Sequence, residues 1–186
     1  NGRLTTWNSN LSLLSNGTSM FQQCSSLRSI SCGNFNNLTN GTQMFGYSGL
    51  TSLNYDMENL VIGDNMFYHC SNLTSFSGDL SKLQRGFHMF DACPSLTNVS
   101  FGENGLAALV NATDMFKGCS LNYQSLNNIL NALPSRSGTI HITVADSVKN
   151  DLANDENFED GEVPAYNSGN YYEFTHNSGW TIQLTS

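Results

Sequence analysis

A Met-Phe pair recurs five times at nearly constant spacing, and this repeat constrains the fold more than any other feature of the sequence. The pairs start at Met20, Met44, Met66, Met89 and Met115, so they follow one another at intervals of roughly 23 residues. A Cys follows the Phe by three residues in four of the units, and a Ser takes its place in the second. The period predicts a chain built from equivalent structural units.

The same register extends upstream of the first Met-Phe pair. Apolar residues of the first unit reappear three periods later at one constant offset, as in the match of Leu4 with Leu73 and of Met20 with Met89. The sequence therefore begins inside a repeat, and we expect further repeats N-terminal to residue 1. The five units start at Leu4, Leu27, Leu50, Leu73 and Leu96.

One unit of this length is too short to bury its own apolar side chains, so successive units must stack to make a core. The Leu-x-x-apolar segment of each unit is predicted to be a strand, with neighbouring strands about 4.8 Å apart. The stretch from there to Met-Phe-x-x-Cys is predicted to return the chain by a helical or irregular path. We expect Met66, Met89 and Met115 to form one buried column.

These motifs resemble the BspA-type leucine-rich repeats of bacterial surface proteins. The match is clear in Met66-Phe67-x-x-Cys70-x-x-Leu73-x-x-Phe76 and covers about residues 4–119. The resemblance implies an α/β repeat fold, a right-handed leucine-rich-repeat solenoid of about five turns with a parallel sheet on one face. It also implies surface exposure and a role in adhesion or protein binding. Similar repeats are common in phage virion and tail proteins, which gives an alternative origin.

The cysteines allow two interpretations. Cys24, Cys70, Cys93 and Cys119 share one repeat position, so those on adjacent turns should stack at a separation that a disulfide permits. A column of buried free thiols that act as small apolar groups is the favoured interpretation, because the odd number of five Cys shows no paired spacing. Cys32 is also predicted to lie in the core.

After residue 119 the repeat pattern ends, and residues 120–186 are predicted to be a cap that hides the last apolar turn. The apolar spacing of this region favours a mixture of helices and strands, and Pro134 should end the first helix. The predicted elements are a helix over 120–133, a strand over 139–144, a short helix over 146–152, an acidic exposed loop over 154–162, and a hairpin around 177–179.

The charge argues against several classes of partner. Seven basic and 15 acidic residues give a net charge of −8, so no basic surface is available for nucleic acid or anionic lipid. No apolar run reaches the roughly 20 residues that a transmembrane helix needs. We therefore expect no nucleic-acid binding and no membrane insertion of this segment.

No arrangement of residues predicts catalysis, a metal or a cofactor. The spacing of His69, His88, His141 and His176 is not that of metal ligands, and His69 and His88 should be ordinary exposed side chains. The acidic residues of 154–162 could gather calcium, but their spacing is not that of an EF-hand loop, and a solvated loop is favoured. We therefore predict that the protein is not an enzyme, uses no cofactor and holds no metal.

The candidate binding surface is the outer face of the predicted sheet. If the second apolar residue of each strand points inward, its neighbours form a flat surface of short uncharged groups that could bind a protein or a glycan. This surface lacks aromatic anchors. The predicted function is an extracellular or cell-surface adhesion module that recognises a host protein or glycan, with a structural or receptor-binding component of a phage virion as the alternative. The predicted binding residues are Ser29, Ser31, Ser52, Asn54, Ser75, Ser77, Asn98 and Ser100.

Overall fold

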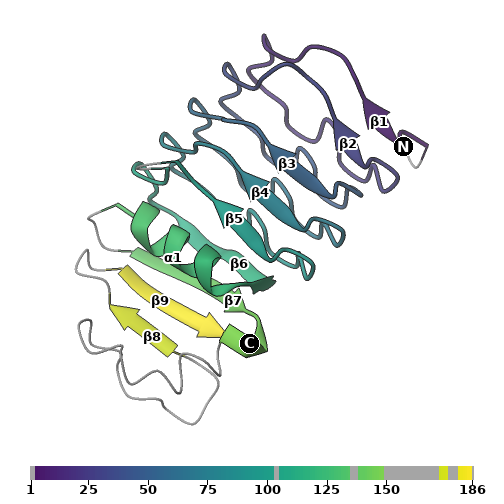
Figure 1. The fold of residues 1–186 in the computed structure, drawn as a ribbon. Helices are drawn as coiled ribbons and strands as arrows, with labels where there is room; N and C mark the ends of the chain where they lie inside the picture. Colours follow the sequence, from purple (N-terminus) through teal and green to yellow (C-terminus); the bar gives the residue numbers. More distant parts are fainter. Residues whose placement is uncertain (1–2, 103–104, 135–137, 149–171, 176–179, 186) are drawn as a thin grey trace.

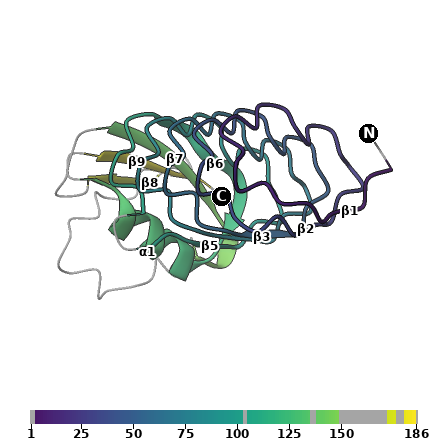
Figure 2. The same cartoon turned by 90° about the horizontal axis from the view of Figure 1, so that it is seen from above.

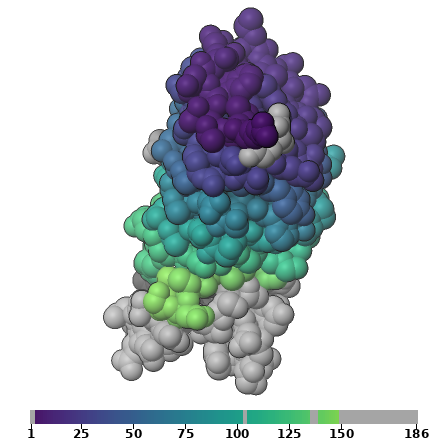
Figure 3. All heavy atoms as spheres, turned by 90° about the vertical axis from the view of Figure 1, so that its right-hand side faces the viewer, coloured from purple at the N-terminus to yellow at the C-terminus, as the bar shows by residue number. Residues whose placement is uncertain are grey.

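The repeats form successive turns that stack along one axis (Figure 1). This computed structural model describes residues 3–102, 105–134, 138–148, 172–175 and 180–185. Figure 3 shows the turns as consecutive bands from the N-terminus onward, so each turn contacts mainly its neighbours. The strands that begin the turns are β1 (Thr6–Trp7), β2 (Ser29–Ile30), β3 (Ser52–Asn54), β4 (Ser75–Ser77) and β5 (Asn98–Ser100).

The strands pair in parallel, and their register reproduces the period of the sequence. Ser52 of β3 lies opposite Ser75 of β4, which lies opposite Asn98 of β5, and each step along the ladder is one repeat period. Strand β1 pairs with β2 in the same way. Parallel strands in repeat register, with few helices, fit a repeat fold.

The sequence predicted one sheet across all five turns, but the sheet divides into β1-β2 and β3-β4-β5. Between β2 and β3 the amide of Thr51 is 3.4 Å from the carbonyl oxygen of Arg28, whereas the equivalent bond from Thr74 to Thr51 is 2.8 Å. The second unit has one residue fewer than its neighbours between Met44 and Leu50, just before β3, and this local shortening accounts for the weaker pairing.

The Phe of each Met-Phe pair belongs to a ladder of stacked rings inside the turns. The ring centroids of Phe21, Phe45, Phe67, Phe90 and Phe116 follow one another at 5.5, 5.3, 5.0 and 5.3 Å, and adjacent rings are within 15° of parallel. Every ring is buried. Offset or parallel aromatic contacts of this kind stabilise a stack beyond the burial of apolar area alone.

The methionines form a second buried column, which confirms the prediction for Met66, Met89 and Met115. Met20 is exposed, and the sulfur of each of the next four methionines lies against a glycine of the preceding turn. A Cβ on Gly63 would be 3.1 Å from Sδ of Met89, and one on Gly86 would be 3.1 Å from Sδ of Met115. The glycine three residues before each of the first four methionines therefore makes room for the methionine of the next turn.

The return path is irregular and not helical. Two residues of each turn have a positive φ, one just before the Met and one two residues after the Phe. In the first four turns the amide of the Phe donates to the carbonyl of the Met in the next turn, as in Phe45 to Met66 at 2.8 Å. Bridges between consecutive turns continue this pairing through Asn16, Asn40, Ile62, Arg85 and Asn111.

All five cysteines are free and buried, as the favoured interpretation predicted. The thiols of Cys70, Cys93 and Cys119 donate to the carbonyl oxygen of the Phe one turn earlier, at 3.0, 3.0 and 3.2 Å. Burial raises the pKa of Cys70 to about 11, which keeps this thiol protonated at neutral pH. The cysteine column thus links turns by hydrogen bonds.

The end of the fifth turn and the chain after it form a four-stranded sheet and, among the described residues, one ten-residue helix and the start of a short one. Strand β6 (Ala112–Leu121) carries the fifth Met-Phe-x-x-Cys segment, so it crosses the predicted boundary at residue 120. The predicted hairpin is present as an antiparallel pair, and the sheet order is β6-β7-β9-β8. The remaining elements are α1 (Tyr123–Ala132), β7 (Gly138–Val144), β8 (Tyr172–Thr175) and β9 (Trp180–Thr185).

Three predictions for this region fall wholly or partly on residues that the structure does not describe. The short helix begins at Asp146 as predicted, and its described part ends at Val148. The acidic run of 154–162 and the tip of the hairpin at 177–179 lie outside the described residues. None of the helices in the described part of the chain is both long and apolar enough to cross a bilayer.

Candidate functional site

The outer face of the sheet has the orientation that the sequence predicted. The middle residues Leu53, Phe76 and Val99 are buried, and their neighbours along each strand lie at the surface. The two columns of short polar residues that result, called the strand face below, lie in register. One column contains Ser52, Ser75 and Asn98, and the other contains Asn54, Ser77 and Ser100.

The other two predicted residues do not join these columns. Ser29 lies opposite Thr6 in the separate sheet of the first two turns. Ser31 follows the end of β2, and its amide donates to the carbonyl of Trp7 at 2.7 Å. The structure therefore brings together six of the eight predicted residues.

A groove of about 230 Å³ lies where the strand face meets α1. Five of the predicted residues line this strand-face groove, but three amide side chains at the start of the helix and along it were missed by the sequence analysis. Those amides could have been found only by knowing that the helix follows β5 in space. The groove is lined by Asn54, Ser75, Phe76, Ser77, Asn98, Val99, Ser100, Asn122, Gln124, Ser125 and Asn128.

Helix α1 lies beside β5, where a further strand would continue the β3-β4-β5 sheet. Its side chains make the hydrogen bonds that such a strand would make to β5. The hydroxyl of Ser125 accepts from the amide of Val99 at 2.8 Å and donates to the carbonyl of Thr97 at 3.0 Å. The side-chain amide of Asn128 donates to the carbonyl of Val99 at 2.9 Å. These bonds satisfy the polar edge of β5, which would otherwise be open for pairing. They also fix the groove wall on a rigid element.

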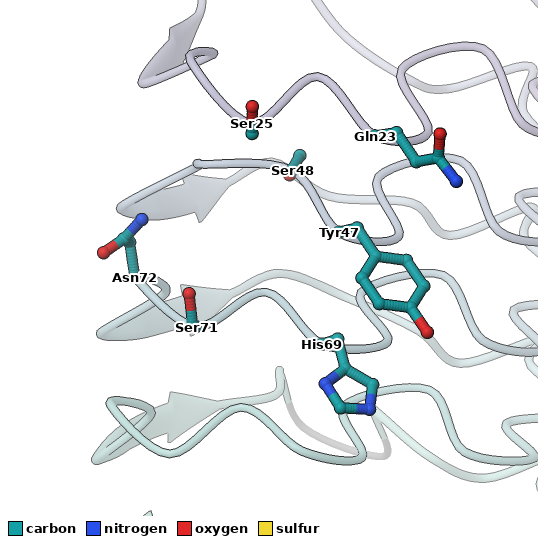
Figure 4. Close-up of a pocket in the computed structure, with 7 residues that line it drawn as sticks. All are labelled: Gln23, Ser25, Tyr47, Ser48, His69, Ser71 and Asn72. Carbon is teal, nitrogen blue, oxygen red and sulfur yellow. The ribbon is translucent and has the colours of Figure 1, made fainter. Parts of the chain in front are cut away.

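A second and larger hollow, of about 420 Å³, lies beside the strands and is called the lateral groove below (Figure 4). It occupies the segment between the Met-Phe pairs and the strand starts, in the first three turns. The residues that line it are Gln23, Ser25, Tyr47, Ser48, His69, Ser71 and Asn72.

Two rings form one wall of the lateral groove. Tyr47 and His69 occupy the same repeat position on adjacent turns, two residues after the Phe, and both have a positive φ, of 59° and 56°. Their rings are parallel within 3° and their centroids are 5.0 Å apart. His69 is exposed, as predicted, but its stacking on Tyr47 was not predicted from the sequence. The signal was available in the alignment, because both residues precede the Cys position by one.

His88 is not the exposed side chain that the sequence predicted. It is half-buried, and its Nδ1 lies 2.6 Å from Oδ2 of Asp91. Asp114 of the next turn is 3.9 Å away from His88 and also bonds His141 at 3.0 Å and Lys117 at 3.3 Å. Asp91 of its own turn and Asp114 of the next turn therefore both face this His.

Electrostatics in this cluster favour the ionised form of Asp114. Burial alone would raise its pKa, but hydrogen bonds from His141 and Lys117 outweigh that effect and lower the pKa. Among the described residues, no group of three or more His, Cys, Asp or Glu side chains is arranged to hold a metal ion. The cluster links His88 and Asp91 of the fourth turn to β6 and, through Asp114, to His141 of β7.

A comparison with known families gives one match. Residues 1–74 match the family model described as "BspA type Leucine rich repeat region (6 copies)". No curated protein and no solved structure matches the chain. The match confirms the resemblance for the first turns. Repeats of this type occur in bacterial surface proteins, suggest a protein-binding module, and are generally non-catalytic.

Proposed function

Because residues 1–74 match BspA-type leucine-rich repeats, we propose that the chain is an extracellular, non-catalytic adhesion module of a bacterial surface protein. In this proposal residues 1–119 form a right-handed solenoid, residues 120–186 cap it, and the strand face binds a host protein. The alternative of a phage-particle component gains no support from the family match.

The observation that carries the proposal is the pair of register-aligned polar columns on the strand face. Six short side chains are held on one ladder at the spacing of adjacent strands, beside a groove of about 230 Å³. Hydroxyl and amide groups can donate and accept hydrogen bonds. Their desolvation on binding costs less than that of charged groups. A polypeptide segment presents complementary amide groups along its length, so a protein ligand suits this surface.

The fixed geometry of the groove supports the same proposal. Asn122 donates to the side-chain oxygen of Asn98 at 2.7 Å, and Ser77 donates to that of Asn54 at 3.3 Å. Side chains that are already held in place lose less conformational entropy when a ligand binds. The strand face therefore offers a preorganised surface.

The test is a binding measurement with the whole chain and a panel of purified extracellular matrix proteins. The variant Ser75→Arg places a long charged side chain at the centre of the strand face, and we expect it to weaken binding by about tenfold or more. The matched control is Asn36→Arg, because Asn36 is exposed and lines neither groove. Thermal melts should show that both variants fold. Equal affinities for the two variants, or no binding by the unsubstituted chain, would overturn the proposal.

A further inference from the structure

We propose that the lateral groove is a binding site for a small neutral saccharide. This inference goes beyond the proposed function of the strand face, because it assigns a second class of ligand to a different surface of the turns. The groove is a built feature of the fold, its wall is aromatic, and its polar lining is uncharged.

The groove is the consequence of one residue missing from the second turn between Met44 and Leu50, which is offset by one extra residue between Leu27 and Met44. Turns one and three have the sequences Cys-Ser-Ser-Leu and Cys-Ser-Asn-Leu before the strand, whereas turn two has only Ser48-Gly49-Leu50. Ser48 and Gly49 are buried, while Ser25 and Ser71 on the turns either side are exposed. The shortened turn therefore lies back between its neighbours and forms the floor of the hollow.

The floor is held in place by specific contacts. Nη1 of Arg28 donates to the carbonyl of Ser25 at 2.7 Å and to that of Gly49 at 3.2 Å. A Cβ on Gly49 would overlap both the Arg28 guanidinium and the Ser25 carbonyl, so only glycine fits. The hydroxyl of Ser48 lies 3.5 Å from the sulfur of Cys70. Backbone and core contacts therefore fix the floor of the hollow.

The wall is aromatic and fixed. Figure 4 shows Tyr47 and His69 along one side of the groove, with Ser71 and Asn72 across from them. The Tyr68 ring packs edge-on against both rings, with centroids 5.6 Å from Tyr47 and 4.4 Å from His69. Tyr47 is still 45% exposed, although two rings pack against it. An exposed, preorganised ring of this kind suits the apolar C–H surface of a sugar.

The polar lining is neutral. Among the described residues that line the groove, the polar groups are the amides of Gln23 and Asn72, the hydroxyls of three serines, the phenol of Tyr47 and the imidazole of His69. No carboxylate, lysine or arginine is among these lining residues, and the nearby guanidinium of Arg28 bonds the carbonyls of Ser25 and Gly49. The net charge of −8 adds a general repulsion for anions. A ligand rich in hydroxyl groups and without charge satisfies these donors and acceptors.

The size of the hollow agrees with this ligand class. Its volume of about 420 Å³ lies at the lower part of the range for small-molecule sites. A monosaccharide or disaccharide fits this space, whereas a folded protein surface would reach only its rim.

The test uses NMR titration of the isotopically labelled whole chain. The probes are neutral sugars, namely galactose, glucose, N-acetylglucosamine and lactose, together with the anionic trisaccharide sialyllactose. We expect at least one neutral sugar to shift the amide signals of Tyr47, His69 and Ser71, and sialyllactose to bind more weakly. Failure of every neutral sugar to shift these signals, or a stronger response to sialyllactose, would overturn the inference.

Variants then locate the site. Tyr47→Ala removes the aromatic wall and Ser71→Trp fills the hollow from its exposed side, and each should weaken sugar binding by about tenfold. Tyr123→Ala is the matched control, because Tyr123 is 43% exposed and Tyr47 is 45% exposed. Loss of binding in the two groove variants but not in the control supports the site. Unchanged binding in both groove variants overturns it.

The strand-face variant separates this inference from the proposed function. Ser75→Arg should leave sugar binding unchanged, because Ser75 lines the other groove. Sugar binding without any protein binding would leave the inference standing and remove the proposed function. If matrix proteins bind, lose affinity on Tyr47→Ala, and no neutral sugar binds, the lateral groove is a protein site and the saccharide inference is wrong.

Discussion

The second and third turns share the Met and Phe columns of the core but have different surfaces. The ring of Phe45 stacks on Phe67 at 5.3 Å, and Phe67 stacks on Phe90 at 5.0 Å. The spacing of the Phe ladder is therefore almost unchanged by the residue missing between Met44 and Leu50. Outside, the same deletion weakens the pairing of β2 with β3 and opens the lateral groove. A repeat protein of this kind can therefore change its surface locally without changing its core.

The reason is the direction in which each residue makes contacts. A core residue such as Phe67 contacts the turn before and the turn after, so any change must satisfy two neighbours at once. A rim residue such as Ser71 faces solvent on one side. Figure 2 shows β1, β2, β3 and β5 along one face of the stack and β6 with β7 along another. Function can vary at the rim while the columns remain constant.

Removal of a core ring is the strongest test of the difference between core and rim. Phe67→Ala deletes the central member of the Phe ladder, and we expect a loss of about 3–5 kcal/mol in the free energy of unfolding, measured by urea titration. Tyr47→Ala in the adjacent turn should cost less than about 1 kcal/mol, because Tyr47 is half exposed. Similar losses for the two variants would show that core and rim are not distinct.

Gly49 tests whether the shortened turn depends on its glycine. Gly49→Ala should cost about 1–3 kcal/mol in the free energy of unfolding, because the new Cβ overlaps backbone that cannot rotate away. The control is Gly102→Ala, whose Cβ would meet nothing closer than 3.8 Å, and its unfolding free energy should change by less than about 0.5 kcal/mol.

A second substitution separates the two overlaps at Gly49. Adding Arg28→Ala to Gly49→Ala removes the clash with the guanidinium and leaves the clash with the carbonyl of Ser25. The double variant should therefore recover only part of the loss attributed to Gly49→Ala, once the effect of Arg28→Ala alone is subtracted. Complete recovery would show that the backbone of turn one does not constrain turn two.

The position after Met-Phe-x-x tests the difference between the two turns at a buried site, because it is Ser48 in turn two and Cys70 in turn three. We expect Cys70→Ala to cost about 1–2 kcal/mol, because it removes buried volume and the donor to the Phe45 carbonyl. Cys70→Ser should cost less, since a hydroxyl can donate to the same oxygen. Denaturant unfolding measures both, and a larger loss for Ser than for Ala would contradict a hydrogen-bonding role.

The parts of the fold that were predicted from the sequence are those that repeat. Met66, Met89 and Met115 share a residue type and an environment, so their spacing alone placed them in one column. The register of β3, β4 and β5 followed for the same reason. Ser75 and Ser77 could be placed on the outer face because Phe76 between them had to point inward.

The parts that were missed depend on departures from the repeat or on contacts between elements. The lateral groove arises because the segment around Gly49 is one residue shorter than in the neighbouring turns. The effect of this shortening on those turns appears only when the turns are stacked. Asn128 reaches the edge of β5 because α1 folds back there, and no periodicity encodes that position. His88 was predicted to be exposed, but Asp91 and Asp114 partner it from its own turn and from the next one.

The smallest expected effect concerns Asp114, a rim residue whose side chain links the fifth turn to β7. Asp114→Asn keeps a residue type that tolerates the positive φ of 52° and removes the charge. Above the ordinary pKa of 3.8 we expect a loss of about 1 kcal/mol, because the variant lacks the carboxylate that bonds His141 and Lys117.

The pH dependence of this loss has a definite sign. The folded pKa of Asp114 is lowered, so its stabilising contribution is present above the unfolded pKa and disappears as the pH falls through the folded value. The difference between Asp114→Asn and the unsubstituted chain should therefore shrink below pH 3.8, in urea titrations across that range. Glu58→Gln, which removes one charge from an exposed residue, should show no such trend. A difference that stays constant to the lowest pH would show that the side-chain shape, and not the carboxylate charge, makes this link.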